Sequence, residues 1–197
     1  MYFECGRIRL RIDFLSAAVI AFFLLTQDAR SFCILLLSAA AHEAGHICVL
    51  LHAGVPRITV DLHPGGAAIR DISPERLSYR QTFAAALAGP AVNLFAAAVF
   101  FTLKHVTAHQ IFVQLCSVHF MLGAVNLLPL SFLDGGTALF SLLSERKKTP
   151  VPPDMTAVDT ITLLCMSAGC LFLIFTGRTA YYALAFTGYC ILSRFLW

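Results

Sequence analysis

The sequence predicts an all-α polytopic membrane protein with about six transmembrane helices and a small interfacial β-hairpin or sheet. Of its 197 residues, 58% are hydrophobic and only 13% are charged, whereas soluble domains typically carry about 45–50% apolar and about 25% charged residues. The mean hydropathy of +0.78 indicates more apolar side chains than one soluble core could bury. The net charge of +3 forms no dense basic stripe, which excludes a nucleic-acid partner.

Six apolar stretches are candidates for crossing the bilayer, which takes about 20 residues each. They are residues 12–27, 32–53, 80–103, 110–130, 157–176 and 179–197. The first resembles the core of a signal peptide, but the residues after it contain no small-x-small cleavage site, so we expect an uncleaved span.

The basic residues between these spans indicate how the chain is oriented. With residues 1–13 and every second loop on one side, that side carries eleven lysines and arginines and the other side carries three. The positive-inside rule makes the basic side cytoplasmic. We therefore expect a multi-pass protein of the cell membrane, with both termini and the opening of any active site on the cytoplasmic side.

Two segments alternate polar and apolar residues, which is typical of β-strands. In 57–72, the alternation is followed by the turn sequence His63-Pro64-Gly65-Gly66 and resumes after it, which predicts a β-hairpin. Residues 7–14 alternate as cleanly, and we expect residues 1–13 to contain an N-terminal interfacial strand. The alternative is an ordinary surface loop with a basic anchor for anionic lipid.

The remaining cytoplasmic segment, 145–156, is charged and broken by prolines, which predicts a linker before the last two spans in 157–197. No internal repeat is visible in the sequence. We expect residues 1–197 to form a single membrane-embedded domain.

The second predicted span contains His42-Glu43-Ala44-Gly45-His46, an H-E-x-x-H pattern. The spacing of four places both imidazoles on one helix face, one turn apart, as two ligands of one metal require. A zinc ion held there leaves room for a bound water, whose proton Glu43 can accept. The alternative is a self-satisfied polar cluster, but ionisable residues within a span are costly without a function.

A catalytic zinc needs a third protein ligand, and Asp134 is the candidate at the matching depth. Pro129 breaks the fourth span before it, and the Gly135–Gly136 pair permits a tight turn that aims the carboxylate inward. Asp134 could instead cap a helix over 137–144. His119 is a rival ligand that lies nearer the middle of the membrane.

These motifs together resemble the site-2 protease family of intramembrane zinc metalloproteases. The resemblance rests on the membrane-embedded H-E-x-x-H, the distal Leu-Asp-Gly at 133–135, and Gly89-Pro90-Ala91-Val92-Asn93, which is similar to the family's Gly-Pro-x-x-Asn signature. It implies Zn²⁺ as the cofactor, and we expect its ligands to be His42, His46 and Asp134.

The resemblance also implies roles for residues that do not bind the metal. Glu43 would be the general base, and Asn93 a catalytic residue that holds the substrate backbone or the oxyanion. The family's β element is thought to receive an unwound substrate strand at its edge. The expected substrate-binding residues are therefore Gly65, Gly66, Ala67, Ala68, Asn93 and Asn126. The alternative for the Gly-Pro-x-x-Asn segment is a kink that serves helix packing.

The function implied is hydrolysis of peptide bonds in membrane-anchored protein substrates by a single metalloprotease domain embedded in the lipid bilayer. A substrate helix must unwind before its carbonyl can react, because its own hydrogen bonds shield it. We expect the first, fifth and sixth spans to act as the gate. The alternatives are a membrane zinc transporter or metal sensor without hydrolysis, which would need ionisable residues along a path, and a structural scaffold.

The Asn126-Leu127-Leu128-Pro129 sequence is nearest the short branch of the family that includes the stage IV sporulation protease. Relatives there cleave a membrane-tethered precursor of a sporulation sigma factor and are held inactive by partner membrane proteins. Leu127, Phe132 and Thr137 depart from the residues of many other members. We expect neither a PDZ insertion nor a CBS domain after Trp197, so regulation by ATP is expected to be absent or supplied by another chain.

Overall fold

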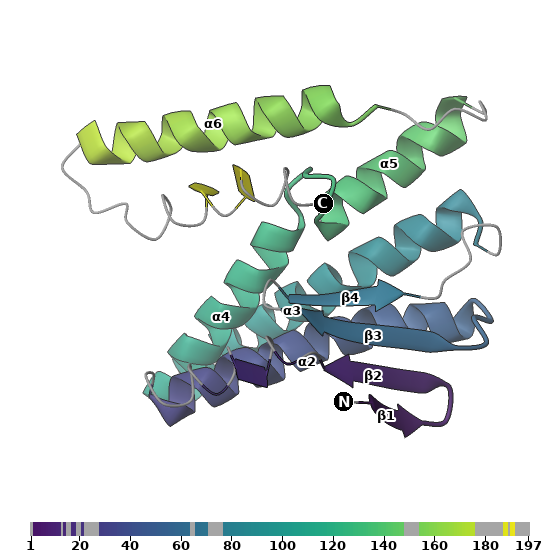
Figure 1. Ribbon diagram of the computed structural model, residues 1–197. Coiled ribbons are helices and arrows are strands. Elements are labelled where there is room, and N and C mark those ends of the chain that lie inside the picture. The colour runs from purple at the N-terminus through teal and green to yellow at the C-terminus, as the bar shows by residue number, and fades with distance from the viewer. Residues whose placement is uncertain are drawn as a thin grey trace.

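The computed structural model is mostly helical, with one small sheet at the side of the helices (Figure 1). It describes residues 2–12, 14, 17–18, 21, 28–63, 66–70, 77–147, 154–175, 187–188 and 190–191. The elements are β1 (Tyr2–Cys5), β2 (Ile8–Ile12), α2 (Ala29–His52), β3 (Ile58–His63), β4 (Gly66–Arg70), α3 (Tyr79–Thr107), α4 (Gln110–Asn126), α5 (Asp134–Lys147) and α6 (Thr156–Phe175).

Helix α3 is the central helix, because α2, α4 and α5 all pack against it. Both long helices begin at a polar cap that satisfies their first backbone N–H groups. The Asp28 carboxylate accepts from Ser31 N at 3.1 Å before α2. Ser78 and Gln81 form a reciprocal capping box at the start of α3. The caps explain why these helices begin where the apolar runs do.

Four of the six predicted spans correspond to helices of the structure. Among the described residues, α2 and α3 are long and apolar enough to cross a membrane, and α4 and residues 156–170 of α6 are shorter apolar helices. The predicted spans 12–27 and 179–197 lie almost entirely outside the described residues. The count of six spans therefore stays a prediction.

The sheet has the order β1-β2-β3-β4. Strands β3 and β4 pair antiparallel, with Val60 opposite Ile69, which confirms the hairpin predicted within 57–72. Strand β2 pairs parallel to β3, with Ile8 opposite Ile58. Because parallel neighbours need a long crossover, α2 lies in the connection between them. The surface-loop alternative for this segment is wrong.

The single strand predicted for residues 1–13 is wrong in one respect. The segment forms two strands, β1 and β2, which pair antiparallel with Tyr2 opposite Arg11. Gly6 lies in the turn between them with a φ of 59°. A left-handed backbone suits glycine, which has no Cβ to clash, and it allows the chain to reverse there.

An apolar cluster fixes the sheet to the helices. It contains Leu50 near the end of α2, Val55, Ile58 and Val60 of β3, and Ala85 in the second turn of α3. Burial of each large aliphatic side chain stabilises such a cluster by about 1.5–3 kcal/mol. The sheet is therefore held at the end of α2 that follows His46.

The turn between α4 and α5 is fastened to α6. Ser131 donates from its backbone N to Asp159 Oδ1 at 2.8 Å and from its Oγ to Asp159 Oδ2 at 2.7 Å. Leu130 of the same turn is fully buried in a cluster with Leu163 and Cys190. The predicted linker 145–156 begins later than expected, because α5 continues to Lys147, and 148–153 lies outside the described residues.

Replacing Asp159 by alanine is expected to destabilise the protein by about 1–3 kcal/mol, because Ser131 then keeps two donors without their acceptors. Chemical denaturation of the purified protein in detergent measures this change. Ser167→Ala, in the same helix, is the control, since among the described residues Ser167 bonds only to Leu163 O of its own helix. Equal stabilities of the two variants would show that the hydrogen bonds between Ser131 and Asp159 do not stabilise the fold.

Candidate metal centre

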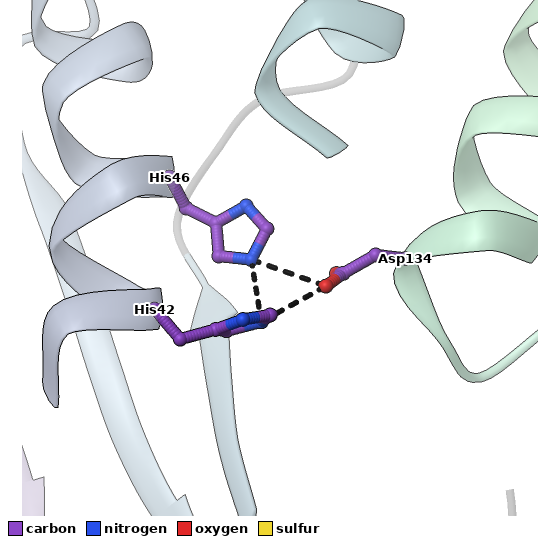
Figure 2. Close-up of side chains that lie close together, drawn as sticks. All are labelled: His42, His46 and Asp134. Carbon is purple, nitrogen blue, oxygen red and sulfur yellow. Dashed lines mark hydrogen bonds and ion pairs between the residues drawn. The ribbon is translucent and has the colours of Figure 1, made fainter. Parts of the chain in front are cut away.

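Three side chains from two distant segments converge on one point. His42 Nε2 and His46 Nε2, both from α2, lie 3.0 and 3.3 Å from Asp134 Oδ2, at the start of α5 (Figure 2). The two nitrogens are 3.1 Å apart. Ligands at about 2.0–2.1 Å from a tetrahedral zinc are separated by roughly 3.3 Å, so the spacing fits that ion.

The surroundings of these atoms also fit a cation. Asp134 Oδ2 is buried, and the two imidazole nitrogens lie near it without a hydrogen bond that meets ordinary geometry. Burying such a carboxylate oxygen is costly, and a metal ion at the point where the three atoms meet would offset that cost. Two imidazole nitrogens and one carboxylate oxygen form a donor set that zinc takes in catalytic sites, with a fourth position left open. The three predicted ligands therefore form one candidate metal centre.

Gly89 of α3 leaves the space that the two imidazoles occupy. A Cβ built on Gly89 would lie 2.8 Å from His42 Nε2 and closer still to His46 Nε2. Any larger residue would therefore displace the ligand nitrogens. This explains why a glycine stands at the point where α3 crosses the H-E-x-x-H turn of α2.

The chain presents Asp134 through a close approach of two backbones. A Cβ on Gly135 would clash with Leu127 O, and one on Gly136 with Leu130 O. The glycine pair thus lets the first turn of α5 pack on the preceding turn, where the sequence indicated only a sharp bend. The helix begins at Asp134 itself, and its Oδ2 faces the histidines, so capping is not the role of this oxygen.

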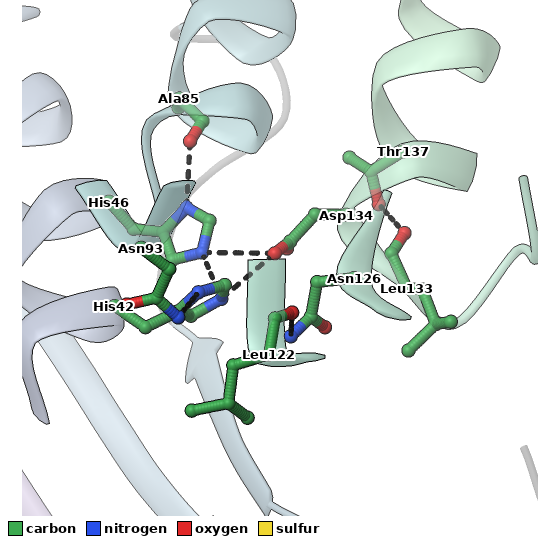
Figure 3. Close-up of polar contacts among 9 residues, drawn as sticks. All are labelled: His42, His46, Ala85, Asn93, Leu122, Asn126, Leu133, Asp134 and Thr137. Carbon is green, nitrogen blue, oxygen red and sulfur yellow. Dashed lines mark hydrogen bonds and ion pairs between the residues drawn. The ribbon is translucent and has the colours of Figure 1, made fainter. Parts of the chain in front are cut away.

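Each histidine has its own partner at Nδ1. His46 Nδ1 donates to the backbone oxygen of Ala85 at 2.7 Å, which leaves Nε2 without a proton for a metal (Figure 3). His42 Nδ1 lies 3.2 Å from the carboxamide nitrogen of Asn93. The oxygen of that carboxamide lies 3.1 Å from His119 Nδ1. A backbone carbonyl and a side-chain amide therefore orient the two rings.

The other predicted site residues lie around this centre in different ways. Glu43 is on α2 between the histidines, half-buried and bonded to none of the described residues. Asn126 is the last residue of α4 and donates to Leu122 O at 3.0 Å. Gly66, Ala67 and Ala68 lie in β4, an edge strand, and Gly65 is outside the described residues.

Two features of the site were not predicted. His119 is not in the metal-ligating group of the described residues, and contacts Asn93 instead. Asp159, whose carboxylate is bonded to the turn before Asp134, was overlooked. An acidic residue within an apolar span is a signal of function or pairing and could have identified it.

Comparison with known proteins shows which family the chain resembles. A family model described as peptidase family M50 matches residues 104–173, which include Asp134. The putative zinc metalloprotease Rip3 of Mycobacterium tuberculosis is 31% identical over 170 residues, covering 81% of this chain and 43% of that protein. The zinc metalloprotease MJ0392 of Methanocaldococcus jannaschii is 30% identical over 121 residues, covering 58% of this chain and 34% of that protein.

Among solved structures, the site-2 protease from Methanocaldococcus jannaschii aligns with a TM-score of 0.59. The sequences are 20% identical, and the alignment covers 98% of this chain and 89% of that chain, so the two share a fold. The chain spans less than half the length of the curated relatives that it matches.

Gly89→Ala is expected to weaken zinc binding about ten-fold or more without changing any ligand, because the new methyl group occupies the position of the ligand nitrogens. Competition with a chromogenic chelator measures the zinc affinity. Gly169→Ala in α6 is the matched control, since a Cβ there meets nothing within 4 Å. If the two variants bind zinc equally well, the α3 backbone does not approach the ligands as the structure has it.

Proposed function

The chain belongs to the site-2 protease family of zinc metalloproteases, within peptidase family M50, and we propose that it hydrolyses peptide bonds of membrane-anchored protein substrates. The observation that carries this proposal is the convergence of His42, His46 and Asp134 around one point beside Glu43. Such a set provides three ligands, an open position for water and a general base, which are the parts of a hydrolytic zinc site.

The chemistry divides between the metal and the chain. A zinc ion held by the three ligands would polarise the scissile carbonyl and acidify a water molecule. Glu43 accepts the proton of the attacking water and passes it to the leaving amine. Its carboxylate is suited to this because it is half-buried and hydrogen-bonds to none of the described residues.

We propose that the substrate binds as an extended strand along β4. Among the described strands, β4 has a partner on one side only, so its other edge can pair with a further strand. Strand β3, next to it, shares an apolar cluster with Ala85, whose carbonyl orients His46. The backbone of Gly66–Ala68 and the side chain of Asn126 are the proposed contacts with substrate. A substrate helix has to unwind before it can bind this way.

We further propose that the protein crosses the cell membrane several times, with both termini and the opening of the site in the cytoplasm. The eleven-to-three division of basic residues supports this orientation. The first, fifth and sixth predicted spans would control access to the site. The lipid bilayer would then be the solvent of most of the chain.

The finer proposal concerns the substrate and its control. The Asn126-Leu127-Leu128-Pro129 sequence supports the branch of the stage IV sporulation protease. The substrate would then be a membrane-tethered precursor of a sporulation sigma factor, and an inhibitory membrane protein would hold the enzyme inactive. Co-expression with candidate precursors, followed by detection of the released fragment, distinguishes this substrate from other membrane-anchored proteins.

Glu43→Gln is expected to lower proteolysis about 10²–10⁴-fold while zinc content stays close to that of the unsubstituted protein, because glutamine keeps the shape and cannot accept the proton. Immunoblotting of a co-expressed membrane-anchored substrate measures cleavage, and metal analysis measures zinc. Retained cleavage in this variant would remove Glu43 from the mechanism. Loss of zinc would make it a ligand.

Ala67→Pro is expected to reduce substrate cleavage severalfold with unchanged zinc content, because proline removes a backbone donor from the edge strand. Glu4→Pro is the matched control, since Glu4 lies in β1 at the opposite edge of the same sheet and, like Ala67, is one residue from the pair that flanks its two-residue turn. Cleavage reduced to the same extent in both variants would argue for general damage to the sheet and against strand addition at β4.

The orientation is tested with single cysteines introduced after the seven native cysteines have been replaced. An impermeant thiol reagent added outside intact cells is expected to label a cysteine at Lys104 and not one at Lys147. Labelling of the second position alone would reverse the topology.

A further inference from the structure

Asn93 links three helices at a fully buried position. It lies on α3, and its carboxamide fills the gap between His42 on α2 and His119 on α4, with none of the side chain exposed. The carboxamide nitrogen is 3.2 Å from His42 Nδ1, and the oxygen is 3.1 Å from His119 Nδ1. Both ends of the amide are therefore occupied by an imidazole.

Zinc ligation restricts which end can face His42. A neutral imidazole carries one proton, and a ring that binds a metal through Nε2 must carry it on Nδ1. His42 Nδ1 is then a donor, and it needs an acceptor. The carboxamide oxygen of Asn93 is such a group, and the nitrogen is not. A half-turn of the carboxamide exchanges two atoms of similar size and meets this requirement.

The same half-turn determines the state of His119. The carboxamide nitrogen of Asn93 then faces His119 Nδ1 and donates to it, so this nitrogen must be the unprotonated one. His119 is buried beside Phe100, with the ring centroids 5.4 Å apart, and its Nδ1 contacts no described residue besides Asn93. Its neutral ring can accept at Nδ1 when the proton is on Nε2.

We propose that Asn93 and His119 are positioning residues that hold His42 as a zinc ligand. His42 Nδ1–H donates to Asn93 Oδ1, and Asn93 Nδ2–H donates to His119 Nδ1. This inference rests on the zinc site of the proposed function and replaces the substrate-contacting role predicted for Asn93. Burial argues against a direct substrate contact, since Asn93 is 0% exposed.

The two ligand histidines are thus oriented by different means. The partner of His46 is the backbone oxygen of Ala85, which no substitution removes. The partner of His42 is a side chain, and it is held in turn by another. Only the partners of His42 can therefore be tested by mutation. These partners, Asn93 and His119, lie on α3 and α4, which carry none of the three metal ligands.

The test measures zinc affinity of the full chain, purified in detergent, by chelator competition. Removing a partner of a metal-ligating histidine typically costs about 10–100-fold in affinity. We expect this loss in Asn93→Ala. Asn93→Asp should restore most of the affinity, because its carboxylate accepts from His42 Nδ1–H. Asn93→Leu has a similar branched shape without an acceptor, so we expect it to lose as much affinity as Asn93→Ala, whereas it would rescue a role in packing alone.

His119→Phe fills the same volume without an acceptor, so we expect a smaller loss of affinity in the same direction. It also serves as the second test if Asn93→Ala does not fold. Ser38→Ala is the matched control, because Ser38 is fully buried one turn before His42 and bonds, in the part of the chain that the structure describes, only to Ile34 O. Its zinc affinity should equal that of the unsubstituted chain.

Three results would decide against the proposal. Unchanged zinc affinity in Asn93→Ala, accompanied by lost cleavage, would restore the substrate contact. Unchanged affinity in His119→Phe would remove His119 from the arrangement. Affinity retained in Asn93→Leu but lost in Asn93→Ala would indicate packing only. Failure of the proposed function looks different, because the unsubstituted chain and Asp134→Asn would then bind zinc equally poorly.

Discussion

The structure depends on bringing two imidazole nitrogens and a carboxylate oxygen to within 3.0–3.3 Å of one another inside an apolar helical body. Burying such groups costs free energy unless they share a cation or complete hydrogen bonds. The fold brings these groups together because helix backbones approach one another closely at glycine residues. Gly89 lets α3 pass against the histidine pair, and Gly135 with Gly136 lets α5 begin directly on the turn that delivers Asp134.

The features that depend on short stretches of chain were predictable. The four-residue spacing of His42 and His46 sets their common face as soon as the segment is helical. The β3–β4 hairpin follows from a local alternation and a turn. The parallel pairing of β2 with β3 was not predictable in the same way, because it joins strands separated by a whole helix. The turn at Gly6 was missed because the alternation begins only after it, at Arg7, and the residues before Gly6 carry no such pattern.

The side-chain contacts of the site were also predictable only in part. Asp134 was predicted as a ligand by its motif, while periodicity alone left His119 as a rival. Helical spacing gives the depth of a residue and the face that it occupies, but not which face of another helix it meets. The packing of α4 against α3 determines that His119 contacts Asn93 and not the metal ligands. Asp159 pairs with Ser131 for the same reason, through contacts far apart in sequence.

The bond pair between Ser131 and Asp159 has a mechanical consequence. Ser131 is three residues before Asp134, and Asp159 lies in the first turn of α6. A displacement of α6 along the α4–α5 turn must either break both bonds or carry Ser131 with it. Movement of a peripheral helix and the position of a metal-facing carboxylate are thus coupled through three residues of backbone. A membrane protein that binds α6 would have a short physical route to Asp134 without entering the metal centre.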